Sequence, residues 1–182
     1  MANHLPVDDY DLIVMGGVGD NNPSKPVIGA NTAKVLRTSK TPVLVVKKDV
    51  SLPVAFDTIV FASGLEPDTH KAFAQLLSFA ETMGASNLHL VEVTTPNNFK
   101  PTFFVREKME AFISKHRVKN IQIHNYNHYT IEAGVFEFAK RVNASLLAIA
   151  NHGRNDITSL FIESVPENLV KFSDVPVLSI MV

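Results

Sequence analysis

The sequence predicts an α/β protein in which a doubly wound, parallel five-stranded sheet follows a shorter βαβ unit. Two observations lead to this prediction. The first is an internal repeat: residues 11–46 and 145–180 align without a gap at a constant offset of 134 residues, so that Gly19 falls on Gly153 and Pro42 on Pro176. The second is the alternation of apolar strand patterns with helical patterns between the two copies.

Both copies of the repeat have the pattern of one βαβ unit. An apolar run leads into a polar, glycine-bearing loop, then a helical pattern, and then Pro-Val-Leu at the start of a second apolar run. In the first copy the predicted strands are Leu12–Met15 and Val43–Val46. The polar stretch Lys47–Pro53 is interpreted as a linker. We therefore divide the chain into residues 1–50, a βαβ remnant, and residues 51–182, a complete domain.

The elements of the complete domain follow in order from Phe56. Pro67 and Asp68 open its first helix, and Gly84 ends that helix as a C-cap. The predicted strands are Thr58–Ala62, Leu88–Val93, Ile121–His124, a strand leading to Ala150, and Val177–Met181; the inward helix positions are Ala72, Phe73, Leu76, Leu77 and Ala80, then Val105, Met109, Phe112 and His116, then Ile131, Val135, Phe138 and Val142. Right-handed crossovers wind this order into a parallel sheet covered on both faces, of the mononucleotide-binding, Rossmann-like type.

Composition limits the classes of function. The 182 residues include no Cys, which excludes disulfides, thiol catalysis and thiolate metal sites and is compatible with a reducing cytoplasm. No apolar stretch reaches the length of a membrane span, and the N-terminus has no secretory signal pattern. A net charge of −1 provides neither a footprint for nucleic acid nor a polybasic membrane anchor. We therefore expect a cytoplasmic protein that binds small ligands or protein partners.

A glycine-rich loop between strand and helix points to phosphate binding. Gly16, Gly19 and Gly29 stand in the first copy at Gly-x2-Gly-x9-Gly spacing, where glycines let the backbone approach a phosphate and helix N-terminal amides point toward it. This spacing resembles the signature of the universal stress protein family, Gly-x2-Gly-x9-Gly-Ser/Thr between the fourth strand and fourth helix. The resemblance extends over residues 10–47 and 56–182, and includes Ile131–Ala139, Asn151-His152-Gly153-Arg154 and Glu163-Ser164-Val165.

The resemblance implies a tandem protein with an adenine nucleotide alpha hydrolase-like fold. Residues 1–50 would be the C-terminal part of a first universal stress protein domain whose N-terminal part is missing, and residues 51–182 would be a complete second domain. Family dimers commonly form through the last strand, so Val43–Val46 should lie antiparallel to Val177–Met181 in one continuous sheet. Leu12–Met15 should then be an inner strand without its outer neighbour, which predicts a homodimer or higher homo-oligomer.

The resemblance also implies a nucleotide site. Its residues are Ala62, Ser63, His152, Gly153, Arg154, Ser164 and Val165 in the complete domain, and Gly16, Gly19 and Gly29 in the first copy. In the complete domain two of the three signature glycines are replaced, by Ala150 and Glu163, and Gly64 stands where ATP-binding members have an Asp. A carboxylate about 4 Å from a phosphate oxygen costs about 1 kcal/mol in water and about 4 kcal/mol at an effective dielectric of 20. We therefore expect a degraded ATP site.

Other polar groups have structural interpretations beside functional ones. Ser164 and Glu167 form a capping box, although the serine hydroxyl could also donate to a phosphate. His152 and Arg154 could steer an anion, or could be solvated loop residues. His124 and His128 have no carboxylate at ligand spacing, so a strand-to-helix turn is favoured over a metal site.

Exposed aromatic side chains would mark a partner surface. Phe103, Phe104, Met109 and Phe112 could form one on a helix edge, but we predict that they pack in the core.

Two functions fit these observations. The first is a non-catalytic stress-response protein that acts through dimerisation or a protein partner and has no cofactor. The alternative is an ATP-binding stress sensor with weak or no ATPase activity, using Gly153, Arg154 and Ser164. An acyl- or adenylate-transferring enzyme is disfavoured because no Ser, His and Asp arrangement or other catalytic pair is visible.

Overall fold

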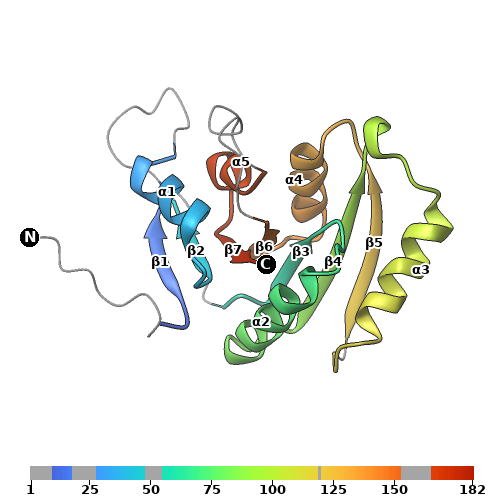
Figure 1. Ribbon diagram of the computed structural model, residues 1–182, viewed down its shortest axis with the longest axis horizontal. Coiled ribbons are helices and arrows are strands. Elements are labelled where there is room, and N and C mark those ends of the chain that lie inside the picture. Colours follow the sequence, from blue (N-terminus) through green and yellow to red (C-terminus); the bar gives the residue numbers. More distant parts are fainter. Residues whose placement is uncertain (1–9, 18–27, 48–54, 119, 153–164) are drawn as a thin grey trace, which may run out of the picture.

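The computed structural model describes residues 10–17, 28–47, 55–118, 120–152 and 165–182. A single sheet passes through this part of the chain, with the strand order β1-β2-β7-β6-β3-β4-β5 (Figure 1). The strands are β1 (Ile13–Gly16), β2 (Val43–Val46), β3 (Thr58–Ala62), β4 (Asn87–Thr94), β5 (Ile121–Asn127), β6 (Leu146–Asn151) and β7 (Val177–Met181). The helices are α1 (Ala30–Thr38), α2 (Thr69–Thr82), α3 (Thr102–Ile113), α4 (Ile131–Arg141) and α5 (Val165–Phe172), with a short 3-10 turn, η2 (Pro96–Asn98).

The sheet has seven strands, so the predicted five-stranded sheet is too small. Strands β3 to β7 pair in parallel, and β1 pairs in parallel with β2. Strand β2 pairs antiparallel with β7, which confirms the predicted contact between Val43–Val46 and Val177–Met181. Because β2 takes up the hydrogen-bonding groups along the outer side of β7, the N-terminal unit extends the sheet rather than standing beside it.

The junction between β2 and β7 is symmetric. Leu44 faces Leu178, with Val43 opposite Ser179 and Val45 opposite Val177. The repeat offset of 134 residues also carries Leu44 onto Leu178. The two βαβ units are therefore related by a local two-fold axis between these leucines, the arrangement of an isologous dimer interface inside one chain.

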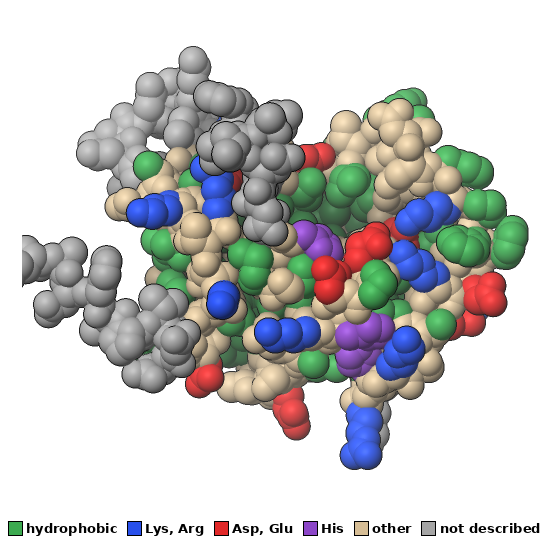
Figure 2. Space-filling view, in the orientation of Figure 1, with side chains coloured by type: hydrophobic (Ala, Val, Ile, Leu, Met, Phe, Trp, Pro, Cys, Tyr) green, Lys and Arg blue, Asp and Glu red, His purple; other side chains and the backbone are tan. Residues whose placement is uncertain are grey.

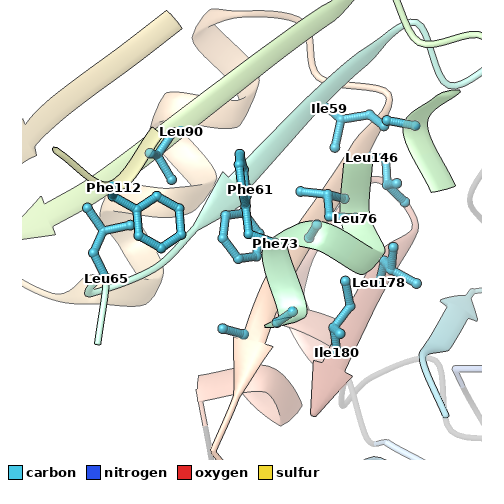
Figure 3. Close-up of a cluster of buried hydrophobic side chains, with 14 of the residues drawn as sticks. Ile59, Phe61, Leu65, Phe73, Leu76, Leu90, Phe112, Leu146, Leu178 and Ile180 are labelled. Atoms are coloured by element: carbon cyan, nitrogen blue, oxygen red, sulfur yellow. The ribbon is translucent and has the colours of Figure 1, made fainter. Parts of the chain in front are cut away.

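Helices cover the two faces of the sheet unequally. One face packs against α2 and α3 in a cluster that includes Phe61, Phe73, Leu76 and Ile180 (Figure 3). The rings of Phe61 and Phe73 lie 5.5 Å apart between centroids. The other face packs against α1, α4 and α5, so the helices of the two repeated units lie on the same side. Within the described residues, no helix has the length and apolar character that a membrane span requires.

Most predicted element positions agree with the structure. The C-cap at Gly84 is confirmed by its φ of 70° and by the hydrogen bond from the Ala85 amide to the Ala80 carbonyl. One strand end was predicted too early, because β5 continues to Asn127. Its last residues, which we interpreted as a turn, pair with the equally long β4.

The prediction that all four residues on α3 pack in the core is wrong for two of them. Phe103 and Phe104 are 73% and 50% exposed, whereas Met109 and Phe112 are buried. Residues three or four apart share a helix face, so Val105, Met109 and Phe112 face the sheet together. The two exposed phenylalanines precede this face and point away from it.

Candidate functional site

A cavity of about 590 Å³ lies at the carboxyl ends of β3, β4 and β6. The chain leaves β3 toward β4 on one side, whereas β6 and β7 lie on the other side of β3. This reversal of strand order is the place where open α/β sheets bind ligands. On the face shown in Figure 2, acidic, basic and histidine side chains gather near the middle of the molecule. The fold thus provides a concave site of ligand size.

The structure brings four of the predicted site residues together. Ala62, Ser63, His152 and Val165 line the cavity, from the end of β3, the end of β6 and the start of α5. Ala150 also lines it, so the methyl group that replaces a signature glycine stands at the site. The remaining predicted residues of this domain, Gly153, Arg154 and Ser164, lie outside the described residues, as does Glu163.

The glycines of the first copy belong to a different place. Gly16 ends β1, and its carbonyl accepts a hydrogen bond of 2.8 Å from the Thr32 hydroxyl. Gly29 is the N-cap of α1 in extended conformation, and its amide donates to the Gly17 carbonyl. Neither lines the cavity at β3 and β6, and Gly19 lies outside the described residues. The first copy therefore keeps a strand-to-helix turn of its own.

Hydrogen bonds hold the turn after β3. The Ser63 hydroxyl accepts from the Leu65 amide at 2.9 Å, and Leu65 has a φ of 56°, in the left-handed region. Lys108 donates to the Gly64 carbonyl at 2.6 Å. A Cβ on Gly64 would lie 3.2 Å from Glu66 Oε1. An Asp at position 64 would therefore meet another carboxylate, so this chain differs from the ATP-binding pattern at two adjoining places.

Sequence reasoning missed an ion pair in the cavity wall. Glu92 is 3% exposed, and its Oε1 lies 2.5 Å from the Nζ of Lys100. Within the described part of the chain, Glu92 Oε2 has no hydrogen-bond partner. Both residues line the cavity, together with Asn98. The available signal was an acidic residue inside an apolar strand pattern, since buried carboxylates require partners.

His152 pairs with an acid on the rim of the site. Its Nδ1 lies 3.3 Å from Asp68 Oδ2, and the two side chains are 46% and 56% exposed. Ion pairs this exposed contribute little to stability. The neighbouring Asn151 points elsewhere, because its amide donates to the Leu36 carbonyl at 2.6 Å. This bond ties the end of β6 to α1 of the first unit.

The histidines of this domain pair with one another rather than forming a metal centre. His89 Nδ1 lies 3.0 Å from His124 Nε2, and His70 Nδ1 lies 2.8 Å from His116 Nε2. His128 instead lies 3.2 Å from Glu137. In the parts of the chain that the structure describes, no three His, Asp or Glu side chains are grouped as metal ligands would be.

Burial governs the protonation of the four paired histidines. Burial lowers the pKa of His89, and it lowers the pKa of His124 together with the charge on His89. Burial and the charge on Lys115 lower the pKa of His70, and His116 has a lowered pKa for the same reasons. A pair of neutral imidazoles forms one N–H···N hydrogen bond, so these pairs are built for the uncharged state.

Comparison with known proteins identifies the fold and the family. The sequence model of the universal stress protein family matches residues 7–47 and 55–180. The chain belongs to the universal stress protein family. The two matched segments correspond to the N-terminal unit and to the domain that carries the cavity. Among curated proteins, none matches the chain.

Solved structures of universal stress proteins share this architecture. A protein from Archaeoglobus fulgidus superposes with a TM-score of 0.73 at 21% identity, covering 96% of this chain and 64% of its own. A protein from Pseudomonas aeruginosa gives 0.71 at 18% identity, with the same coverage. A universal stress protein in complex with cAMP gives 0.55 at 22% identity, covering 70% of this chain and 97% of its own. The chain thus spans 64% of the length of the first two.

Proposed function

We propose that this universal stress protein is a non-catalytic stress-response protein whose nucleotide site has lost strong affinity for ATP, and that it acts through dimerisation or a protein partner. The observation that carries the proposal is the charge of the cavity. Glu66 and Glu92 line it, and its cation Lys100 is already bonded to Glu92. A triphosphate therefore meets carboxylates at a position where ATP sites supply amides and cations.

The size of the electrostatic cost decides the consequence for affinity. One carboxylate about 4 Å from a phosphate oxygen costs about 1 to 4 kcal/mol, depending on the local dielectric. This corresponds to a loss of roughly five-fold to a thousand-fold in affinity. The Glu at position 163 adds a further carboxylate to the signature itself. A site with these residues retains a nucleotide-sized cavity while discriminating against its triphosphate.

Calorimetric titration with Mg-ATP tests this function. We expect no binding in the micromolar range and no nucleotide released from the heat-denatured protein. The combined variant Ala150→Gly and Glu163→Gly should then gain affinity, and adding Gly64→Asp should raise it further. Micromolar binding of Mg-ATP by the unmodified chain would contradict the proposal and favour the alternative function.

The alternative is an ATP-binding stress sensor with weak or no ATPase activity. What favours it is the cavity itself, because about 590 Å³ lies within the usual range of ligand pockets. A universal stress protein of similar fold has been solved in complex with cAMP. In this alternative, Gly153, Arg154 and Ser164 would hold the phosphates.

Assembly is the second part of the proposal. Residues 1–50 form the C-terminal βαβ part of a first universal stress protein domain, and residues 51–182 form a complete one, in a cytoplasmic protein. The local two-fold axis between Leu44 and Leu178 supports this division. The same axis makes the outer edge of β1 equivalent to the edge of β6 that β3 occupies. Among the described residues no strand pairs with that edge of β1, and Val14 is 63% exposed there.

A strand from a second chain would complete this edge. Light scattering coupled to gel filtration should therefore show a homodimer or a larger homo-oligomer. Val14→Lys should shift it to a monomer without loss of secondary structure, whereas Phe103→Lys, equally exposed but at the far end of the sheet, should not. A monomer at micromolar concentration would contradict homo-oligomerisation.

A further inference from the structure

Glu92 has bonding capacity that the described chain does not use. Its side chain is 4% exposed and lines the cavity, and Lys100 donates only to Oε1. Three buried side-chain atoms in the described residues have no hydrogen-bond partner: Thr69 Oγ1, Gln75 Oε1 and Glu92 Oε2. Of these, Glu92 is the one that belongs to this cavity. Because buried carboxylate oxygens are nearly always bonded, Oε2 marks a place for a donor from a ligand.

The terminal carboxylate is able to reach such a donor. The last torsion of a Glu side chain is broad, so rotation about it presents either oxygen to the cavity. Lys100 lies in the connection between η2 and α3 and is 31% exposed, so its ammonium can follow the oxygen that it bonds. The ion pair with Lys100 and a bond to a ligand are therefore compatible.

The charges around Glu92 select an uncharged donor. An anionic ligand meets the carboxylates of Glu66 and Glu92, and a cationic ligand that bonds Glu92 meets the ammonium of Lys100, which lies 2.5 Å from the same carboxylate. A neutral N–H group avoids both repulsions. It also completes a charge-assisted hydrogen bond, which is stronger than one between neutral groups.

The rest of the wall selects an apolar body for the ligand. Val91 and Val93 of β4, Ile131 and Val135 of α4, and Ile149 of β6 line the same cavity. Such a wall favours a flat or compact apolar group over a hydrated chain. Ser63 and Asn98 add polar groups at its margin.

We propose that this cavity binds an uncharged, amino-substituted heterocycle of nucleoside size, whose amine donates to Glu92, and that it discriminates against the phosphorylated form. This inference rests on the proposed function, since both require the cavity to reject a triphosphate. Its new element is the ligand class and the role of Glu92 as the specificity-determining acceptor.

Two nucleosides that differ by one amine test the inference. Adenosine carries an exocyclic amine, and purine riboside has the same ring system and ribose without it. We expect adenosine to bind about ten- to hundred-fold more tightly in calorimetric titration, the range for a buried hydrogen bond to a charged group. In Glu92→Met the two nucleosides should bind equally, because the acceptor is gone.

Matched variants separate the carboxylate from the ion pair. Lys100→Gln removes the cation but can still donate to Oε1, so it should keep the preference for adenosine. Glu110→Gln, in an exposed pair with Arg106, should change nothing. Circular dichroism and a melting curve of each apo variant establish that it is folded.

The outcomes distinguish this inference from the proposed function. Equal binding of both nucleosides, no binding of either, or the same loss of preference in Glu92→Met and Lys100→Gln overturns the inference. If neither nucleoside nor Mg-ATP binds, the inference fails while the proposed function stands. If Mg-ATP binds more tightly than adenosine, both fail.

Discussion

Val14 and Ala148 occupy equivalent positions in the two copies of the repeat, but Val14 is 63% exposed and Ala148 is 1% exposed. Each follows an apolar residue at the start of its strand, and each lies one step before the glycine-bearing turn in the alignment. The difference comes from their neighbours. Strand β6 lies between β7 and β3 and under α2, whereas β1 pairs on one side only. Burial here is a property of the assembly around a strand rather than of the strand's own pattern.

The two units are nevertheless joined as firmly as parts of one core. At the junction Leu44, Val45, Leu178 and Ile180 are all at least 94% buried. Beside it, Arg37 of α1 forms a two-pronged ion pair with Glu167 of α5, at 2.5 and 3.1 Å. The repeated unit thus forms an internal interface on one edge and has an exposed edge on the other.

Charge placed at the junction should have the largest effect on the comparison. Val45→Asp or Ile180→Asp buries an unpaired carboxylate at a position that is 2% or 0% exposed. We expect each to lower the free energy of unfolding by about 4 kcal/mol or more, or to prevent folding. The control Val14→Asp should change it by less than about 0.5 kcal/mol. Urea denaturation measures all three, and an unchanged stability for Val45→Asp would refute the pairing of β2 with β7.

Removing one side of the Arg37 ion pair should have the next largest effect. Arg37→Met leaves the carboxylate of Glu167, 1% exposed, without this guanidinium. Because Arg37 is itself 34% exposed and water replaces part of the interaction, we expect a loss of about 2 kcal/mol. The exposed pair Arg106–Glu110 serves as control, and Arg106→Met should cost less than about 0.5 kcal/mol. Equal losses in thermal or urea denaturation would show that Glu167 finds other partners.

Acid should loosen the second unit before the first. The lowered pKa of His89, His124, His70 and His116 means that the unfolded chain takes up protons at a higher pH than the folded chain. Stability is therefore complete above the unfolded pKa of about 6.5 and falls as the pH drops below it. The described residues from 10 to 47 contain no His.

Hydrogen exchange and melting curves follow this effect. We expect a lower melting temperature at pH 5.5 than at pH 7.5, with protection lost in β4 and β5 earlier than in β2. The double variant His89→Gln and His124→Gln should show a weaker pH dependence. A stability that rises on acidification would contradict the assignment of neutral pairs.

The smallest effect is expected where the two copies differ by one methyl group. Gly16 aligns with Ala150, and a Cβ built on Gly16 meets no atom within 4 Å. Gly16→Ala should therefore change the free energy of unfolding by less than about 0.5 kcal/mol. Gly134→Ala is the contrast, because its Cβ would lie 2.6 Å from a methyl group of Val93, and it should cost about 1 to 3 kcal/mol. A large loss for Gly16→Ala in denaturation would point to a conformational requirement at that turn.

The elements and their order could be predicted because they depend on local chemistry. Strand β3 begins and ends where the apolar run does, and Gly84 ends α2 through a left-handed conformation that glycine readily adopts. The antiparallel contact of β2 and β7 was also accessible, through the repeat and the family resemblance. The end of β5 was not, because Asn125 and Asn127 become strand residues only by pairing with β4.

The site was predictable in part for the same reason. Ala62, Ser63, His152 and Val165 meet at one cavity because each adjoins the carboxyl end of a parallel strand or the start of the helix that follows. The ion pair of Glu92 with Lys100 joins residues whose contact depends on how the chain folds back after β4. No periodic pattern encodes such a contact.

The sequence by itself determined the family, the βαβ repeat, the strand order along the chain and the departures from the ATP signature at Gly64, Ala150 and Glu163. Only the tertiary structure decided that one sheet includes both units, that Val14 is exposed and Ala148 buried, and that Glu92 has a bonded and an unbonded oxygen in the cavity. The physical reason is that hydrogen-bond satisfaction and burial depend on which distant groups come together, whereas helix and strand preferences act between neighbours in the chain.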